Sequence, residues 1–104
     1  MISLENELKV AMKTGKVILG SRETLRTVAH GRGRLIILAR NCPPDMKDLI
    51  VHHAKLSNIP TYVCPLSSKE LGETCGRRFM VAALTVLDEG DSEIMKLVEE
   101  QEVG

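Results

Sequence analysis

With 104 residues, the chain is long enough for one hydrophobic core and too short for two. Its 14 basic and 14 acidic residues cancel, so the total charge predicts neither a nucleic acid nor any other partner. Tyr62 and Phe79 are the only aromatic residues, which argues against the platform of several exposed rings that binds single-stranded nucleic acid by stacking.

Hydrophobic periodicity and turn residues predict helices and strands that alternate along the chain. In chain order, they are a helix over 3–14, a strand over 16–20, a helix over 21–31, a strand over 34–39, a helix over 46–56, a strand over 61–64, a short helix over 67–74, a strand over 80–88 and a last helix over 91–100. The segment RLIILA, residues 34–39, is a continuous aliphatic run, as expected for a strand covered on both faces. This alternation favours an α/β sandwich with a central sheet and crossover helices.

Capping and turn residues mark several of these boundaries. Ser21 is expected to be the N-cap of the second helix, with Glu23 in the first turn, where a carboxylate suits the helix dipole. Residues 41–45, which include two prolines, are expected to turn the chain before the third helix. Asp91 or Ser92 is expected to cap the last helix.

Cys42, Cys64 and Cys75 are an odd number of cysteines, widely spaced and without a C-x-x-C pair. This spacing suits neither zinc nor a disulfide framework, so we expect buried thiols and a reducing compartment. The N-terminal segment MISLENELKVAMK is amphipathic and contains two glutamates, unlike a signal or transit peptide. No apolar run approaches the roughly 20 residues that cross a bilayer. We therefore expect a soluble, cytosolic protein with no membrane partner.

Nucleotide-binding and catalytic motifs find little support. Only one glycine follows the first strand, whereas Walker A and dinucleotide-binding turns need several glycines at fixed spacing. His52 and His53 are adjacent in a predicted helix, where successive side chains diverge by about 100°, so they do not converge on one metal. The acidic residues of 88–93 lack the spacing of a calcium-binding loop. We predict no enzymatic activity, no metal and no cofactor.

The charges are unevenly distributed although they cancel in total. Residues 16–40 carry six arginines or lysines against one glutamate, and residues 88–104 carry seven acidic residues against one lysine. Such asymmetry is a reason to consider a polyanionic partner. On charge alone, two solvated faces of opposite sign are the simpler interpretation.

Three segments are expected at one end of the predicted sandwich: residues 20–23 after the first strand, 40–43 after the second, and 74–79 before the last. The carboxyl ends of strands are the usual ligand position in such sheets. Gly20 would let a bulky backbone approach, and the helix that starts at Ser21 presents free amides that attract phosphate.

Basic residues and an aromatic ring accompany these segments. Arg22 and Arg26 are one turn apart on the same helix face, and Arg77, Arg78 and Phe79 follow a glycine. Taken singly, each has a simpler explanation as a turn, a solvated side chain or a core residue. Their convergence favours RNA as the ligand.

Four stretches carry a resemblance to a known family: KVILGSRETLR, RLIILARNCPPDMKDLIVHHAKLSNIPTYV, ELGETCGRRFMVAAL and LDEGDSEIM. They resemble the archaeal and eukaryotic L-thirty-e branch of the kink-turn-binding L-seven-A-e family of ribosomal proteins, in order and over nearly the whole chain. The resemblance implies a three-layer α-β-α sandwich with a four-stranded mixed sheet, and a single RNA-binding domain over residues 1–104.

The resemblance also implies a function in translation. It implies a structural, cytoplasmic protein of the large ribosomal subunit that binds a kink-turn in ribosomal RNA, adjoins other large-subunit proteins, and is monomeric when free. A kink-turn is an RNA bend with tandem sheared G·A pairs, a sharply folded backbone and an extruded base. From the residue pattern and the resemblance together, the predicted RNA-binding residues are Gly20, Ser21, Arg22, Glu23, Arg26, Asn41, Gly76, Arg77, Arg78 and Phe79.

Chemistry gives several of these residues a specific role. Arg22 can form bidentate hydrogen bonds to guanine O6 and N7, and Phe79 can pack on a splayed base or sugar. The broader family typically has asparagine-glutamate where this chain has Arg22-Glu23, so the role of Glu23 is open. The loop ETCGRRFM is more basic than in other branches, which predicts more phosphate contact and a stronger salt dependence.

Two alternatives remain at this point. The first is a kink-turn-binding protein of another ribonucleoprotein, such as a guide-RNA particle or RNase P. The second is a non-RNA α/β module that binds a small ligand or a protein through the acidic C-terminal helix. The second leaves Arg22, Phe79 and the basic loop without a use.

Overall fold

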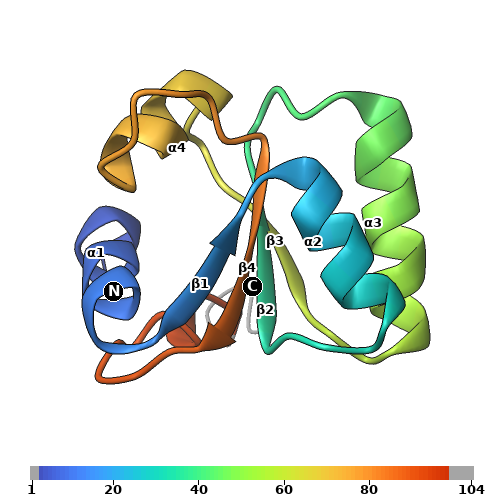
Figure 1. Cartoon of the computed structure of the whole chain (residues 1–104), viewed down its shortest axis with the longest axis horizontal. Helices are drawn as coiled ribbons and strands as arrows, with labels where there is room; N and C mark the ends of the chain where they lie inside the picture. The colour runs from blue at the N-terminus through green and yellow to red at the C-terminus, as the bar shows by residue number, and fades with distance from the viewer. Residues whose placement is uncertain (1–2, 99–104) are drawn as a thin grey trace.

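Four helices alternate with four strands in the computed structural model, which describes residues 3–98 (Figure 1). They are α1 (Leu4–Thr14), β1 (Lys16–Leu19), α2 (Ser21–Ala29), β2 (Leu35–Leu38), α3 (Pro44–Leu56), β3 (Thr61–Val63), α4 (Ser68–Thr74) and β4 (Ala83–Asp88). This is the order predicted from the sequence. Within the described part of the chain, every helix is too short or too polar to cross a membrane.

The strands form one mixed sheet in the order β1-β4-β2-β3. The last strand, β4, is antiparallel to both of its neighbours, whereas β2 and β3 are parallel. As a result β1, β2 and β3 all point toward one edge of the sheet, and β4 starts from that edge. The predicted four-stranded mixed sheet is confirmed, and its topology gathers three strand ends and one strand start in one place.

Helices cover both faces of the sheet, which confirms the three-layer sandwich (Figure 1). One core cluster joins α1 and α4 to the sheet and includes Leu8, Leu71, Leu35 and Ile37. The other joins α2 and α3 to the opposite face and includes Val28, Ile50, Ile36 and Leu38. Successive residues of β2 alternate between the two clusters because strand side chains point alternately to the two faces. The aliphatic run is therefore buried on both sides, as predicted.

The three cysteines are free and buried, which confirms their predicted role as small core residues. Cys64 and Cys75 lie in the cluster under α1 and α4, and Cys42 lies in the cluster under α2 and α3. Burial raises the pKa of all three thiols, that of Cys75 to about 11. Thiols of this kind are poor nucleophiles near neutral pH.

Some predicted boundaries are wrong, and each has a local cause. The last strand begins at Ala83 and not at residue 80, because the N–H of Val81 donates to the Ser68 carbonyl (3.0 Å) instead of to a neighbouring strand. Helix α3 begins earlier than predicted, at Pro44. Proline is favoured in the first turn, where its missing N–H needs no partner.

The predicted last helix also begins later than expected. Residues 91–95 are not helical, and the helical backbone covers residues 96–98. The prediction that Asp91 or Ser92 caps this helix is therefore wrong: the Ser92 Oγ accepts a hydrogen bond from the Ile94 N–H (3.1 Å), within the segment that precedes the helix. Residues 99 and 100, which also belong to the predicted helix, lie outside the described residues.

We expect Leu84→Ala, in β4, to lower the free energy of unfolding by about 2–5 kcal/mol. The substitution removes a fully buried side chain and leaves a cavity in the core between the sheet and helices α1 and α4. Leu56→Ala is the matched control, since 70 % of the Leu56 side chain is exposed. The control should change stability by less than about 0.5 kcal/mol. Urea unfolding of both variants measures this, and equal losses would contradict the assignment of β4 to the core.

Candidate nucleic-acid interface

A groove of about 580 Å³ lies at the edge of the sheet where β1 and β2 end and β4 begins. We refer to it as the strand-end groove. Its lining residues are Gly20, Ser21, Arg22, Glu23, Asn41, Pro43, Ser68, Met80 and Ala82. Five of the ten predicted RNA-binding residues are among them, so the topology does bring the first two predicted segments together.

Gly20 forms the junction between β1 and α2. Its N–H remains in the sheet, donating to the Ala83 carbonyl (2.9 Å), while its own carbonyl accepts the first helical hydrogen bond from Thr24 (2.9 Å). One residue thus ends a strand and starts a helix, at φ 108° and ψ 144°, a conformation that is costly for residues with a Cβ. The N-cap is therefore Gly20, and the prediction that Ser21 caps this helix is wrong.

The start of α2 leaves backbone amides open to the groove. Within residues 3–98, the N–H groups of Ser21, Arg22 and Glu23 have no hydrogen-bond acceptor, and the Gly20 cap supplies no side chain. A Cβ built on Gly20 would meet nothing within 4 Å, so the groove side of this turn is open. Exposed amides at a helix N-terminus attract anions, phosphate included.

The charged side chains of α2 have different positions. Arg22 lines the groove and is exposed, whereas Arg26 lies one turn further along and does not line it. Glu23 lines the groove but also pairs with Arg26, with 3.6 Å between Oε1 and Nη1. Both partners are more than half exposed, so this ion pair is weak. Glu23 therefore has an ion-pair partner within the protein, even when no ligand is bound.

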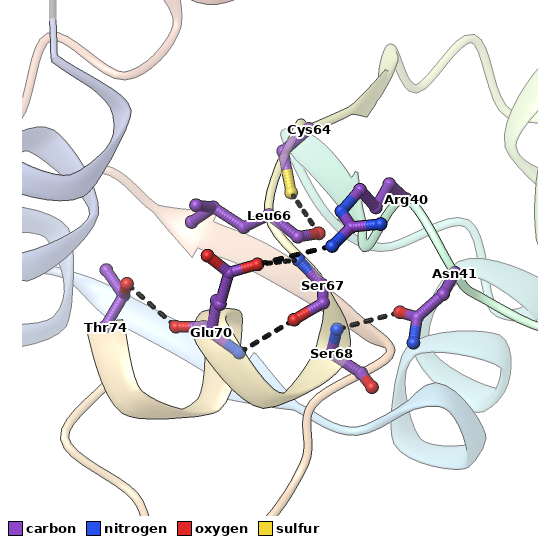
Figure 2. A network of polar contacts seen from close by, with 8 residues as sticks. All are labelled: Arg40, Asn41, Cys64, Leu66, Ser67, Ser68, Glu70 and Thr74. Carbon is purple, nitrogen blue, oxygen red and sulfur yellow. Dashed lines mark hydrogen bonds and ion pairs between the residues drawn. The ribbon is translucent and has the colours of Figure 1, made fainter.

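Asn41 holds the start of α4 against the end of β2 (Figure 2). Its Oδ1 accepts a hydrogen bond from the Ser68 N–H at 2.8 Å, and that amide is the first of α4. The preceding residue adds a second link, because the Arg40 N–H donates to the Leu66 carbonyl (2.9 Å). The amide nitrogen of Asn41 is not used in this contact, and it remains available at the groove that Asn41 lines.

The same helix start is reinforced by a capping box (Figure 2). The Ser67 Oγ accepts from the Glu70 N–H (3.2 Å), and Glu70 Oε1 accepts from the Ser67 N–H (3.0 Å). Hydrogen bonds from Ser67 are the main reason why the pKa of Glu70 is lowered, with the nearby Arg40 adding to the effect. The Arg40 guanidinium lies 3.7 Å from the Glu70 carboxylate.

Backbone contacts hold the loop between α4 and β4 against α4. Gly76, at φ 73°, donates to the Glu73 carbonyl, and Arg77 donates to the Gly72 carbonyl, both at 2.9 Å. These two bonds are the Schellman arrangement that ends many helices at a glycine. Gly76 therefore has a structural role of its own, independent of any RNA contact.

The same packing exposes the apolar side chains of the loop. A Cβ on Gly72 would overlap the carbonyl oxygen of Phe79, so the loop backbone lies directly on the helix. Phe79 and Met80 are 57 % and 70 % exposed. The interpretation of Phe79 as a core residue is therefore excluded.

Three of the remaining predicted residues, Arg77, Arg78 and Phe79, lie beside the strand-end groove and not in it. A hollow of about 400 Å³ is lined by Lys69, Glu73, Arg77, Arg78, Phe79 and Met80. Met80 lines both this hollow and the groove, so the two adjoin. Gly76 faces a third hollow, toward α1. The predicted set thus divides into a groove, an adjoining hollow, and the more distant Arg26 and Gly76.

Three residues of the groove lie outside the segments predicted to meet here: Ser68, Met80 and Ala82. Pro43 belongs to the predicted segment 40–43 but not to the predicted RNA-binding residues. The sequence predicts Met80 in the last strand because it directly precedes an aliphatic run. Ser68 lies 27 residues from Asn41, and no local pattern connects them. For Met80 the only signal is its position beside Phe79 and the two arginines.

The described residues offer no metal site. Residues 3–98 contain no group of three or more histidine, cysteine, aspartate or glutamate side chains that could hold an ion. The His52 and His53 rings contact each other edge to face, with their centroids 5.5 Å apart.

Comparison with known proteins identifies the family. Residues 2–96 match the family described as the ribosomal protein L7Ae/L30e/S12e/Gadd45 family. The chain belongs to this family. The match covers α1 through β4 and therefore includes every element that builds the groove.

Relatives in this family extend over almost the whole chain. The large ribosomal subunit protein eL30 of Methanocaldococcus jannaschii is 50 % identical over 99 % of this chain and 94 % of its own length. The eL30 proteins of Methanothermobacter thermautotrophicus and Saccharolobus solfataricus are 43 % and 40 % identical, over 93 % and 96 % of this chain and 99 % and 93 % of their own lengths.

A solved structure shares the fold of the family at low identity. A Bacillus halodurans protein, described as being of unknown function, superposes with a TM-score of 0.80 and 20 % identity. The alignment covers 95 % of this chain and 99 % of that one. At this identity the likeness concerns the fold alone.

We expect Asn41→Ala to lower the free energy of unfolding by about 1–2 kcal/mol, because the partly buried Ser68 amide loses its acceptor. Asn41→Asp keeps an acceptor oxygen at this position and should restore most of that loss. Thermal and urea unfolding of both variants measure the effect. If both substitutions are neutral, Asn41 does not hold α4 in place.

Proposed function

We propose that this protein is a structural RNA-binding protein of the large ribosomal subunit, and that it recognises a kink-turn in ribosomal RNA. The ribosomal role rests on the eL30 relatives, which align along up to 99 % of the chain at up to 50 % identity. It implies a place in the cytoplasm, on the ribosome, with ribosomal RNA and neighbouring large-subunit proteins as partners. We propose no enzymatic step, and we propose that residues 1–104 act as one RNA-binding domain that is monomeric when free.

The strand-end groove is the observation that carries the RNA-binding part of the proposal. It combines one exposed arginine with unpaired helix amides and an open glycine turn. A guanidinium can read the O6 and N7 atoms of a guanine through two parallel hydrogen bonds. The amides of Ser21, Arg22 and Glu23 suit a phosphate. Guanines beside a sharply folded backbone, as in a kink-turn, present both groups together.

Asn41 fits the same ligand. Its Oδ1 is committed to Ser68, which fixes the direction of the side chain. Its Nδ2 is a donor for a phosphate oxygen or for an acceptor on a base edge. A donor whose position is set by a structural hydrogen bond loses little conformational entropy when the ligand binds.

The exposed loop completes the site. Phe79 and Met80 offer apolar surface for an extruded base, and base–aromatic stacking contributes about 1–3 kcal/mol per base. Arg77 and Arg78 adjoin them and suit the phosphates on either side of such a base. Because these contacts neutralise phosphates, affinity should fall steeply as salt rises.

The proposed role follows from preferential binding. A kink-turn exchanges between bent and more extended forms, and a protein that contacts only the bent form shifts the population toward it. Stabilising one RNA conformation in this way requires no chemistry on the RNA.

We expect the protein to bind a short kink-turn RNA tightly, and to bind weakly a matched RNA whose sheared G·A pairs are replaced by Watson–Crick pairs. Arg22→Ala should weaken binding to the kink-turn by roughly 1–3 kcal/mol through loss of the guanine contact. Lys96→Ala is the control, since this lysine pairs with Glu93 and does not line the groove. Titrations at two salt concentrations measure all three proteins.

Two results would contradict this proposal. Equal, weak and strongly salt-sensitive binding to both RNAs would mean that the arginines provide only nonspecific attraction. Unchanged affinity of Arg22→Ala, with G·A dependence retained, would refute the role of Arg22 but leave the kink-turn reading intact.

We expect Phe79→Ala to weaken kink-turn binding by about 1–3 kcal/mol while leaving the thermal midpoint nearly unchanged, because Phe79 is largely exposed. Met80→Ala, in the same hollow, shows whether the neighbouring apolar side chain contributes as well. A large drop in the midpoint for Phe79→Ala would mean that the ring stabilises the fold, and the loss of binding could then not be assigned to a lost RNA contact.

A further inference from the structure

We propose that the seam between α1 and α4 is a docking site for an extended segment of another protein, one that carries a basic and an acidic side chain four residues apart. Both helices cover the same face of the sheet, opposite to α2 and α3 (Figure 1). The inference goes beyond the proposed function, since it concerns another face of the molecule and another class of partner.

Two adjoining hollows make up this α1–α4 seam. The first, of about 270 Å³, is the acidic hollow, and its lining residues are Glu5, Lys9, Leu66, Glu70, Glu73 and Thr74. The second, of about 390 Å³, is the basic hollow. It shares Lys9, Glu73 and Thr74 with the first and adds Met12, Lys13, Cys75, Gly76 and Arg77.

The two hollows carry opposite charge. Three glutamates and one lysine line the acidic hollow, whereas two lysines, one arginine and one glutamate line the basic hollow. Among residues 3–98, Lys9, Lys13 and Arg77 make no ion pair. The same holds for Glu5 and Glu73 in this part of the chain. Most of these charges are therefore available to a partner.

The spacing along α1 sets the length of the partner segment. Glu5, Lys9 and Lys13 are exposed and follow one another at four-residue intervals, so they lie on one side of the helix. Glu5 and Lys13 are about 12 Å apart along its axis. An extended chain rises about 3.3 Å per residue, so side chains four residues apart span about 13 Å and point the same way. A basic side chain can then meet Glu5 while an acidic one meets Lys13.

An apolar floor lies between the two charged ends. Met12 is partly buried and packs against the same core cluster as the buried Cys75. The residue midway between the two charges of an extended segment points to the same side as they do. We therefore expect this middle residue to be apolar. A methionine floor adapts to different apolar side chains, because its side chain is unbranched and flexible.

The end of α4 favours a peptide over RNA. The carbonyls of Thr74 and Cys75 accept no hydrogen bond among residues 3–98, so they can receive backbone N–H groups of a peptide. A helix C-terminus carries partial negative charge, which disfavours phosphate. The glutamates of the acidic hollow repel a polyanion as well, whereas a protein segment can carry both signs of charge.

The described acidic segment after β4 does not cover the seam. The Asp91 N–H donates to Thr14 Oγ1 (2.9 Å), and the Ser92 Oγ donates to the Glu7 carbonyl (2.7 Å). Lys9 lies two positions after Glu7, which is about 200° around the helix. The segment therefore packs on the other flank of α1, and the seam stays open to another molecule.

The test follows the amide NMR signals of isotope-labelled protein while the capped peptide Ser-Lys-Ser-Leu-Ser-Glu-Ser is added to millimolar concentration. The spacing control, Ser-Ser-Leu-Ser-Lys-Glu-Ser, has the same composition with its charges adjacent. Ser-Lys-Ser-Leu-Ser-Lys-Ser is the charge-swapped peptide for Lys13→Glu. Lys55→Glu is the control variant, because this exposed lysine lies on α3, across the sheet from the seam.

We expect the first peptide to shift the signals of Lys9 and Thr74 and to leave those of Ser21 and Arg22 unchanged. Lys13→Glu should weaken its binding about fivefold or more, and should bind the charge-swapped peptide as tightly as the wild type binds the first. Lys55→Glu should match the wild type. The spacing control should bind the wild type more weakly than the first peptide does.

Several outcomes would overturn the inference. They are unshifted seam signals, equal binding of the spacing control, an equal loss in Lys55→Glu, or no binding of the charge-swapped peptide to Lys13→Glu. Oligouridylate that shifts the seam signals would make the seam an RNA site instead.

Two further outcomes would assign the seam to this chain and so overturn the inference as well. Tighter peptide binding after Glu99, Glu100 and Glu102 are all changed to glutamine would mean that the chain's own acidic end occupies the seam. A wild-type dimer in analytical ultracentrifugation that Lys13→Glu dissociates would mean that a second copy does. Recognition of the kink-turn through Arg22 is measured separately, so the proposed function survives each of these results.

Discussion

The antiparallel placement of β4 between β1 and β2 determines where the other parts of the molecule lie. It makes β1 and β2 parallel without direct contact between them, so both deliver their final residues to one edge. The groove exists because Gly20, Asn41 and the loop before β4 all meet at that edge. With the opposite direction for β4, residues 76–82 would lie at the far edge, away from Arg22.

At this edge, backbone hydrogen bonds hold the turns in place, so most side chains are not needed for that purpose. Gly20 ends a strand and starts a helix within one residue, and Gly76 reverses the chain after α4. Asn41 is the exception, since its Oδ1 accepts the hydrogen bond from Ser68 that holds α4 and the residue also lines the groove. In the proposed site, stability and RNA binding are therefore expected to be separable at Arg22 and Phe79 but linked at Asn41. A substitution at Asn41 thus requires both measurements before its effect can be assigned.

The parts of the fold that the sequence predicted well are those that depend on local pattern. The order of helices and strands follows from periodicity, and the burial of residues 34–39 on both faces follows from an unbroken aliphatic run. The errors arise where a distant partner decides. Residues 80–82 have strand-like sequence, but Val81 hydrogen-bonds to Ser68 and leaves the sheet. Ser21 has an N-cap side chain, but Gly20 occupies the cap position because β4 holds its amide.

The candidate site shows the same division. The convergence of residues 20–23 and Asn41 could be predicted, because alternating helices and strands imply parallel strands whose ends meet at one edge. Met80 and Ser68 line the groove because of tertiary packing, which no local sequence pattern encodes. Gly76 illustrates a second limit, since a glycine that ends a helix and a glycine that admits a ligand look alike in sequence. The RNA contacts themselves stay predictions.

The position of β4 also has a consequence for how the chain matures during its own synthesis. β4, one of the two inner strands, is the last strand of the described residues to be made, and among these residues β1 pairs with β4 alone. While a nascent chain emerges, β2 and β3 can pair, but β1 must wait for residues more than 60 positions downstream. Closure of the sheet, and with it the groove, is therefore a late and non-local event, of the kind that slows folding. The groove therefore forms only after residues 83–88 have joined the sheet.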